Sequence, residues 1–354
     1  MLQPRTKEYI RYAKVLLRDG WDLIRQRFGQ PLPPLSRSDV LWAYRTLLDR
    51  DPTGEAEISA RLQECTSHEQ LRWRIMTSRE YLMRNPPLRM PSLDGDEPPM
   101  CIEELQAAAE LQALLAHVQQ AWQHLGATEP YWSVVTGAEY LMANIEQTRE
   151  QFYETGQPDV ARVQRTLERN GVEMAQLRTC LEYGCGLGRV TRWLAPHFDQ
   201  LYAYDISLPH LEYIQDYLRQ REVNNVVVKQ IQSVDDLTAM PSVDFVYSLV
   251  VLQHNPPPVI ALLLKRLLQA LNPGGYAYFQ TPTYRMNYRF CLDDYLQNEG
   301  QRQEMEMHVL PQSAVFQIAQ QTGAQVVEVL EDGHTGMRHK ERSNTFLVRK
   351  LPKP

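Results

Sequence analysis

Apolar residues follow two different spacings along the chain, and the change between them separates a helical N-terminal part from a mixed C-terminal part. Before residue 130 the apolar positions recur with the helical period over 5–28, 38–48, 55–64, a stretch after Ser67, and 103–125. From residue 179 onward, short continuous apolar runs occur, as expected for strands buried on both faces. These runs predict strands at 179–183, 201–205, 225–228, 243–251, 276–281, 325–330 and 345–348.

Helical spacing returns ahead of the first predicted strand and between most of the later ones. A chain in which helices and strands alternate in this way is typical of βαβ units and therefore of an α/β fold. The predicted helices of this part cover 159–169, 189–198, 209–221, 259–271 and 311–322.

The stretch 181–207 carries the most specific pattern in the sequence. It places Gly184, Gly186 and Gly188 on alternate positions between the first strand and a helix, and it places Asp205 at the end of the second strand. Glycine lacks a Cβ atom, so the backbone can turn sharply and a ligand can lie against peptide N–H groups. An acid at the end of the second strand accepts hydrogen bonds from ribose hydroxyls. Together these residues predict a nucleotide-binding unit.

The glycine spacing and the acid before it distinguish between classes of nucleotide. A site for a pyrophosphate usually shows G-x-G-x-x-G, whereas this chain has Glu182-x-Gly184-x-Gly186-x-Gly188. A carboxylate at Glu182 would repel a pyrophosphate but suits a ligand that carries an ammonium group. The pattern resembles the first motif of the Rossmann-like S-adenosylmethionine-dependent methyltransferases. The alternatives are a nicotinamide or flavin site and an inactive relative of the fold.

This resemblance continues from Arg178 to Pro282 and includes the Asn-Pro-Gly-Gly turn at 272–275. It implies an α/β fold with a Rossmann-like seven-stranded sheet, mostly parallel with the last strand antiparallel, beside an all-α N-terminal domain. It further implies S-adenosylmethionine as cofactor and S-adenosylhomocysteine as product, with Glu182 near the methionine ammonium and Asp205 on the ribose. The cofactor contacts that it implies are Glu182, Gly184, Cys185, Gly186, Gly188, Asp205, Ile206, Ser233, Val234 and Leu249.

One position departs from the family's pattern. The family usually has an acid directly after the third strand, bonded to the adenine amino group. This chain has Gln232-Ser233-Val234 there and Asp235-Asp236 slightly later. The adenine contact therefore has three candidates, which are Ser233, Val234 and Asp235.

Aromatic residues ahead of the first strand allow two interpretations. In the family this region commonly lies over the cofactor, so these side chains are expected either to stack on adenine or wall off the substrate, or simply to pack within the fold. They are Tyr131, Trp132 and Tyr153.

Two histidines are the predicted catalytic residues. Ligands of open parallel sheets bind beyond the carboxyl ends of the strands, which places Gln253 and His254 beside the transferable methyl group. An alcohol acceptor needs a base, and a neutral imidazole accepts a proton near pH 7. His254 and His308 are the candidates, and their alternative roles are a fixed hydrogen-bonding residue and a helix cap. The tyrosine-rich segment 283–307 is expected to cover the acceptor.

The sequence pattern of the N-terminal third predicts accessory helices. Residues 5–28 form an amphipathic pattern with seven basic and three acidic residues. This helix either packs on protein or binds an anionic membrane surface. Residues 44–54 (YRTLLDRDPTG) resemble a bacterial helical module of uncharacterised function that occurs beside surface-polysaccharide enzymes. The predicted division is an N-terminal helix and linker (1–35), a helical accessory domain (36–90), a linker and helix (91–127), and the methyltransferase domain (128–354).

The composition indicates the class of the protein and the environment in which it is expected to occur. Hydrophobic residues make up 43% and charged residues 23% of the 354 residues, as in ordinary globular proteins, and the formal net charge of −6 argues against nucleic acid as a general partner. No C-x-x-C pair occurs, so we expect reduced thiols and no metal site. Without a signal peptide or a long apolar run, the expected location is the cytoplasm. The five cysteines are Cys65, Cys101, Cys180, Cys185 and Cys291.

Three functional classes follow from these observations. The first is an O-methyltransferase that acts on a small molecule or a carbohydrate precursor. The second is a methyltransferase for a protein, lipid or carrier-bound substrate. The third is a non-catalytic S-adenosylmethionine-binding assembly protein. The helical domain is expected to dimerise or to hold a protein partner in any of them.

Overall fold

The computed structural model of the chain describes residues 34–76, 78, 80–81, 97–104, 107–297, 305–335 and 340–352, which belong to two compact units at 1–90 and 91–354. The basic helix predicted at 5–28 lies outside the described residues. So do residues 91–96, at the start of the linker and helix predicted at 91–127.

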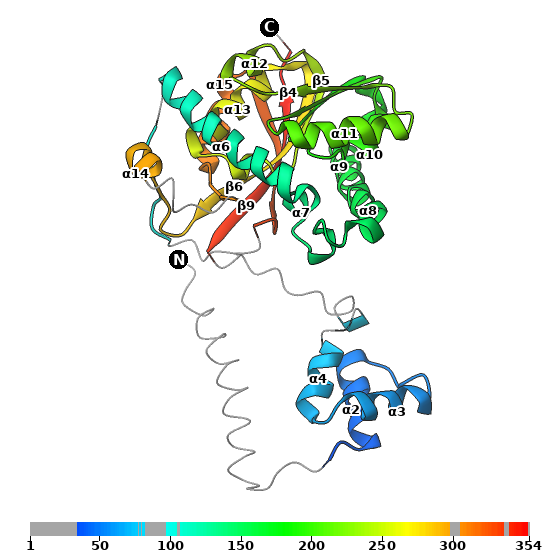
Figure 1. The fold of residues 1–354 in the computed structure, drawn as a ribbon. Helices are drawn as coiled ribbons and strands as arrows, with labels where there is room; N and C mark the ends of the chain where they lie inside the picture. The colour runs from blue at the N-terminus through cyan, green and yellow to red at the C-terminus, as the bar shows by residue number, and fades with distance from the viewer. Residues whose placement is uncertain are drawn as a thin grey trace. The chain divides into compact units, whose positions relative to one another are not determined.

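The smaller unit is a helical module (blue in Figure 1). Its helices are α2 (Arg37–Leu48), α3 (Glu55–Glu64) and α4 (His68–Met76). Ser36 caps α2, and Asp39 completes the reciprocal capping box, so the helix begins one residue before the predicted range 38–48. The core contains Tyr44, whose hydroxyl donates to Glu57 over 3.0 Å and accepts from Arg61. The predicted all-α N-terminal domain is confirmed, and its likeness to the polysaccharide-associated module stays a prediction.

The larger unit is built on a seven-stranded sheet in the order β4-β3-β2-β5-β6-β9-β8. All neighbouring strands are parallel except β9, which is antiparallel to both β6 and β8. The predicted mostly parallel sheet with an antiparallel last strand is therefore confirmed. The strands are β2 (Thr179–Tyr183), β3 (Gln200–Asp205), β4 (Val226–Gln230), β5 (Val243–Ser248), β6 (Leu271–Arg285), β8 (Ala324–Asp332) and β9 (Glu341–Lys350).

Helices cover both faces of this sheet (Figure 1). Leu181, Val246 and Phe279 belong to one apolar core with α6, α13 and α15, whereas Cys180 and Phe245 belong to a second core with α9, α10 and α11. Alternate residues of one strand thus enter different cores, which explains the continuous apolar runs. These helices are α6 (Ala108–Thr128), α9 (Gln157–Arg169), α10 (Thr191–Leu194), α11 (Leu208–Gln220), α13 (Pro257–Gln269) and α15 (Gln312–Gln321).

Shorter elements complete the larger unit. They are α7 (Pro130–Val134), η1 (Ala138–Tyr140), α8 (Ile145–Glu154), η2 (Met174–Gln176), η3 (Ala195–His197), α12 (Val234–Thr238), η4 (Leu252–His254) and α14 (Leu292–Gln297).

Several boundaries differ from the prediction for identifiable reasons. The helix expected over 189–198 is divided into α10 and the 3₁₀ turn η3, because Pro196 lacks the N–H that would continue the helix. The fourth strand ends at Ser248 because Val250 adopts φ 59°. The helix expected over 103–125 begins only at Ala108.

A two-stranded parallel sheet joins the start of the larger unit to the predicted cover segment. In it β1 (Cys101–Ile102) pairs with β7 (Arg289–Phe290). The N–H of Leu292 donates to Glu103 over 2.7 Å, and the Tyr284 hydroxyl donates to the carbonyl of Pro98 over 2.7 Å. We call residues 97–104 the strap, because they bind the segment 284–292 at several points.

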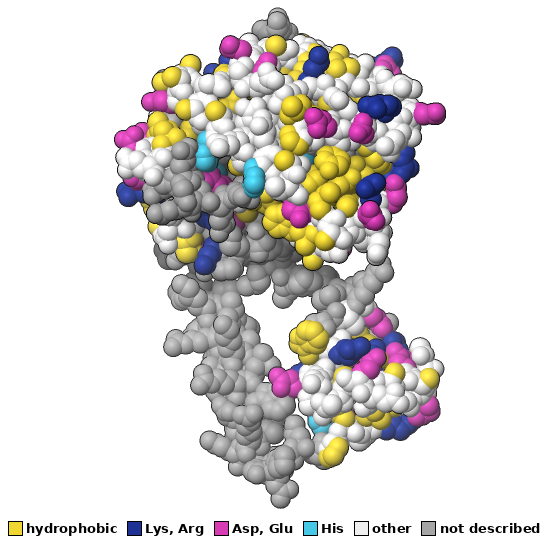
Figure 2. Space-filling model, in the orientation of Figure 1, with side chains coloured by type: hydrophobic (Ala, Val, Ile, Leu, Met, Phe, Trp, Pro, Cys, Tyr) yellow, Lys and Arg dark blue, Asp and Glu magenta, His cyan; other side chains and the backbone are white. Residues whose placement is uncertain are grey.

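The surface of the larger unit mixes acidic and basic side chains, with a hydrophobic patch over the α7 region (Figure 2). Among the described residues, no helix combines the length and the apolar character needed to span a bilayer.

Candidate functional site

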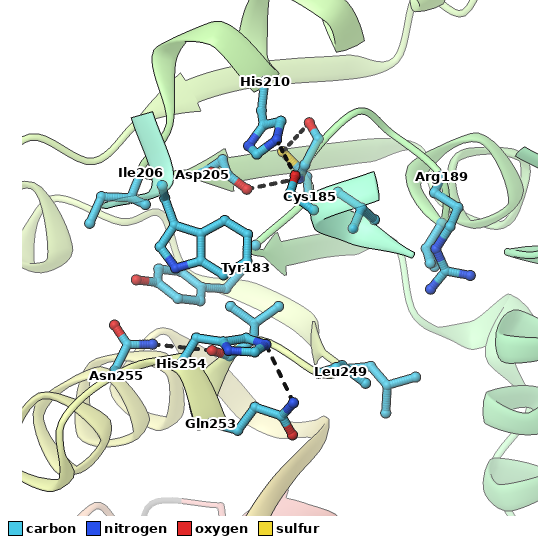
Figure 3. Close-up of a pocket in the computed structure, with 18 of the residues that line it drawn as sticks. Tyr183, Cys185, Arg189, Asp205, Ile206, His210, Leu249, Gln253, His254 and Asn255 are labelled. Atoms are coloured by element: carbon cyan, nitrogen blue, oxygen red, sulfur yellow. Dashed lines mark hydrogen bonds between the residues drawn. The ribbon is translucent and has the colours of Figure 1, made fainter. Parts of the chain in front are cut away.

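The carboxyl ends of β2, β3 and β5 meet at one edge of the sheet, where a cavity of about 340 Å³ lies. Small-ligand sites typically occupy about 300–1,000 Å³. Figure 3 shows Gln253 and His254 on one side of this cavity and Cys185, Asp205 and His210 on the other. The cavity therefore brings together residues from the glycine loop, the second strand and the segment after β5.

The glycine loop lies directly against the cavity. Gly184 and Gly186 line it and have φ 80° and 51°, which glycine adopts without strain. A Cβ atom on Gly184 would overlap Val251. Gly188 has φ 85° but lies outside the cavity lining, and a Cβ there would come within 2.8 Å of Ile214 on α11. Two glycines thus leave room at the cavity, and the third allows the loop to pack on a helix.

Asp205 is held rigidly at the end of β3. It is 8% exposed and lines the cavity. The N–H of Gly186 donates to its Oδ2 over 2.8 Å, and the N–H of Ser207 donates to its Oδ1 over 2.9 Å. Each carboxylate oxygen can accept a further hydrogen bond, so the side chain is oriented for a ligand with hydroxyl groups.

Glu182 is the most perturbed carboxyl of the cavity. It is 2% exposed, and the Thr191 hydroxyl donates to its Oε2 over 2.6 Å. Burial raises the pKa of Glu182 from 4.5 to about 8, against the opposing effects of Thr191 and the Arg189 charge, and the nearby Asp205 raises it further. A cationic ligand beside Glu182 would favour its ionised form.

Two polar groups near Glu182 have no hydrogen-bond partner within the described part of the chain. They are the hydroxyl of Tyr247 and the Nε of Arg189, and both residues line the cavity. Arg189 also pairs with Asp159 over 2.8 Å. Buried polar groups are normally satisfied, so these two leave unused hydrogen-bonding capacity beside the cavity.

His254 faces the cavity from the segment after β5. Its Nδ1 lies 2.8 Å from the carbonyl oxygen of Glu306, and its ring contacts Trp122 edge-on at 5.2 Å. A carbonyl oxygen only accepts, so Nδ1 carries the proton and Nε2 offers a lone pair. Burial lowers the pKa of His254 to about 4, together with the nearby His308 and against the effect of the Glu306 carbonyl. The ring is therefore neutral near pH 7.

His308 is not among the residues that line the cavity. Its Nδ1 lies 2.7 Å from the Tyr288 hydroxyl, and its Nε2 lies 3.0 Å from Oε2 of Glu306. Its backbone N–H donates to the carbonyl of Gln253 over 2.7 Å. The ring thus holds Glu306, whose carbonyl in turn orients His254.

The remaining predicted cofactor residues fall in two groups. Cys185, Ile206 and Leu249 line the cavity. Ser233 and Val234 do not, because Ser233 caps α12 and the N–H of Val234 donates to Gln112 of α6 over 3.0 Å.

Of the aromatic residues predicted near the cofactor, Tyr131 and Tyr153 pack in a buried cluster. Tyr153 stacks on Tyr217 with ring centroids 3.6 Å apart, and it contacts Tyr131 edge-on. Neither tyrosine lines the cavity, and neither does Trp132. Tyr131 and Tyr153 therefore pack within the fold, which is the second of the two interpretations.

Several lining residues had no signal in the sequence pattern. Trp122 comes from α6, Ser133 from α7 and His210 from α11. The Ser133 hydroxyl lies 3.0 Å from Nε2 of His210, and burial lowers the pKa of that ring. Because helical spacing alone does not tell which neighbour a helix covers, only the tertiary fold brings them here.

Residues 149–329 match the family model described as "Methyltransferase domain". No curated protein is a significant match to the sequence. Among solved structures, the chain is similar to magnesium protoporphyrin IX methyltransferase from Synechocystis PCC 6803 with bound SAH, at 16% identity and a TM-score of 0.46 over 67% of this chain and 99% of that one.

A second similar structure is the N-methyltransferase NodS from Bradyrhizobium japonicum WM9 in complex with S-adenosyl-l-homocysteine. It is 15% identical, with a TM-score of 0.42 over 66% of this chain and 98% of that one.

Proposed function

The chain belongs to the methyltransferase-domain family, and from that premise we propose that it transfers a methyl group from S-adenosylmethionine to a hydroxyl oxygen of a small molecule or a carbohydrate precursor. The observation that carries the proposal is the pair of buried carboxyls, Glu182 and Asp205, beside a glycine-rich turn that lines the same cavity.

The residues around the glycine loop fit this cofactor. Glu182, buried and with a raised pKa, favours a cation such as the methionine ammonium. The positive charge of Arg189, which lines the same end of the cavity, suits the carboxylate of the same amino-acid group. Asp205 has acceptor capacity for the ribose hydroxyls. When bound, the cofactor supplies a methyl group that its positively charged sulfur already activates.

The opposite wall suits a neutral acceptor with hydroxyl groups. It combines hydrogen-bonding side chains of Gln253, His254 and Asn255 with the apolar surfaces of Trp122 and Met307. Such a mixture is suited to the alternating polar and apolar faces of a sugar or a similar polyol. Alignment of the acceptor in this wall would contribute through positioning, which is worth roughly 7–11 kcal/mol in well-oriented reactions.

In this mechanism His254 accepts the proton of the acceptor hydroxyl at Nε2. A pKa of about 4 makes the ring a weak base, but it stays unprotonated at neutral pH. The oxygen becomes strongly acidic as it bonds to the methyl carbon, so a weak base suffices at that moment. His308 holds Glu306 and thereby the orientation of His254.

Calorimetric titration of the full chain with S-adenosylmethionine, S-adenosylhomocysteine and NAD tests the proposal. We expect the first two to bind and NAD not to bind. Glu182→Gln and Asp205→Asn should each weaken binding, whereas Glu173→Gln, at an exposed position, should not. Preference for NAD, or unchanged affinity in both cavity variants, would refute the proposal.

A further inference from the structure

A chain of buried side-chain amides runs from Val250 to His254. Val250 has φ 59°, a conformation that β-branched residues rarely adopt, and its N–H donates to Oε1 of Gln280 over 3.1 Å. Gln280 is fully buried on β6, and its Nε2 donates to Oε1 of Gln253 over 3.0 Å and to Oγ of Ser343 over 2.7 Å. The Nε2 of Gln253 lies 3.3 Å from Nε2 of His254, as Figure 3 shows.

Two backbone groups fix the direction of this chain. The N–H of Val250 only donates, so Gln280 turns its oxygen toward Val250 and its NH₂ group toward Gln253. Gln253 must then turn its oxygen toward Gln280, which leaves its NH₂ group facing His254. At the other end the carbonyl of Glu306 only accepts, so His254 carries its proton on Nδ1. Both ends therefore require the same arrangement, which places a lone pair on Nε2.

We infer that Gln280 is a positioning residue that sets the polarity of the cavity wall, so that an N–H donor of Gln253 lies beside the lone pair of His254 Nε2. A hydroxyl group matches this pair, because its proton donates to His254 and one lone pair accepts from Gln253. Its second lone pair is left for methyl transfer.

A neutral amine does not match the same pair. It has one lone pair, which methyl transfer uses, so it cannot accept from Gln253. Its own N–H and the N–H of Gln253 would then compete for the single lone pair of His254 Nε2, and one of the two donors would be left without an acceptor. An unmatched buried donor is unfavourable. The wall thus selects an oxygen nucleophile over a nitrogen one. This selectivity rests on the proposed function, whereas the polarity of the amide chain does not.

Nitrogen NMR of the full chain labelled with ¹⁵N-histidine tests the polarity without cofactor or acceptor. The signals of His254 are assigned by their loss in His254→Gln. At pH 7 we expect a protonated Nδ1 and an unprotonated Nε2. Once ionised, the carboxylate of Gln280→Glu accepts from both Val250 and Gln253, so Gln253 reverses and its oxygen faces Nε2 of His254. Because the Glu306 carbonyl still holds the proton on Nδ1, Nε2 takes up a second proton, and the ring becomes an imidazolium at a higher pH than in the wild type.

Ser343→Ala is the matched control. It removes one hydrogen bond of Gln280 but leaves Val250 to fix the amide, so the His254 signals should stay as in wild type. Gln280→Leu provides an uncharged second variant, in which nothing holds the amide of Gln253 in one orientation, so Nε2 of His254 should take up its second proton at a higher pH than in the wild type.

A protonated Nε2 in the wild-type protein would overturn the inference. So would uptake of the second proton by His254 at the same pH in the wild type and in both Gln280 variants. Failure of cofactor binding in the calorimetric experiment, with the expected NMR result, would refute the proposed function and leave the polarity intact.

Discussion

Replacing Glu182 with glutamine should make the ligand-free protein more stable at alkaline pH. Burial raises the pKa of Glu182 to about 8 in the folded protein, from an ordinary value of 4.5. Below pH 4.5 the carboxyl is neutral in both the folded and the unfolded chain. As the pH rises toward 8, the unfolded chain releases the proton and the folded chain keeps it, so the folded state loses relative stability.

The size of this loss follows from the width of the pH window. At about 1.4 kcal/mol for each pH unit between the two pKa values, the wild-type protein loses about 5 kcal/mol of unfolding free energy in total. Glutamine does not ionise, so the variant does not undergo this loss. The two proteins should be similarly stable at pH 5 and differ by several kcal/mol at pH 9.

Urea unfolding at both pH values measures the effect. The helical unit is identical in wild type and variant, so its contribution cancels in the comparison. Glu173→Gln serves as the control, because this glutamate is exposed and should show no pH-dependent difference. If Glu182→Gln changed the unfolding free energy equally at pH 5 and pH 9, the pKa of Glu182 would not be raised in the folded protein.

Two other variants test the glycine loop and the base. Gly184→Ala should abolish cofactor binding and cost more stability than Gly171→Ala, because Gly171 has a similar φ of 73° but open space around it, so that only the conformational cost of about 1–2 kcal/mol applies there. Thermal unfolding compares the two, and equal losses would contradict the predicted overlap with Val251. His254→Gln should lower kcat by about 10²- to 10⁴-fold without weakening cofactor binding. Because the pKa of His254 is about 4, the wild-type rate should show no acidic limb from this ring above about pH 5, and a rate that falls between about pH 7 and pH 6 would argue against it as the base.

The sequence predicts the sheet and the glycine loop well because both depend on local patterns. Continuous apolar runs gave the strands, since each strand contributes alternate residues to two cores. The positions of Glu182 and Asp205 in the cavity follow from their places at the ends of neighbouring strands. Cys185 lies just after β2 and Leu249 directly after β5, so both residues also line the cavity.

The rest of the site depends on contacts between distant segments. The strap pairs two residues of β1 with β7, which is too short a run to leave a periodic signal. Gln280 lies in a predicted strand, but its role depends on Val250 and Gln253, which only the fold places beside it. Ser233 and Val234 illustrate the opposite case, because Ser233 caps α12 and Gln112 of α6 accepts from the Val234 N–H, and neither residue lines the cavity.

The residues that line the cavity come from separate segments of the chain. The matched family region, 149–329, contains the glycine loop, Asp205 and His254, whereas Trp122, Ser133 and Thr335 come from flanking segments on either side of it. Substitutions in those flanks would reshape the room available to an acceptor without altering the glycine loop, Asp205 or His254. The flanking segments are therefore the place to look for what sets the choice of acceptor.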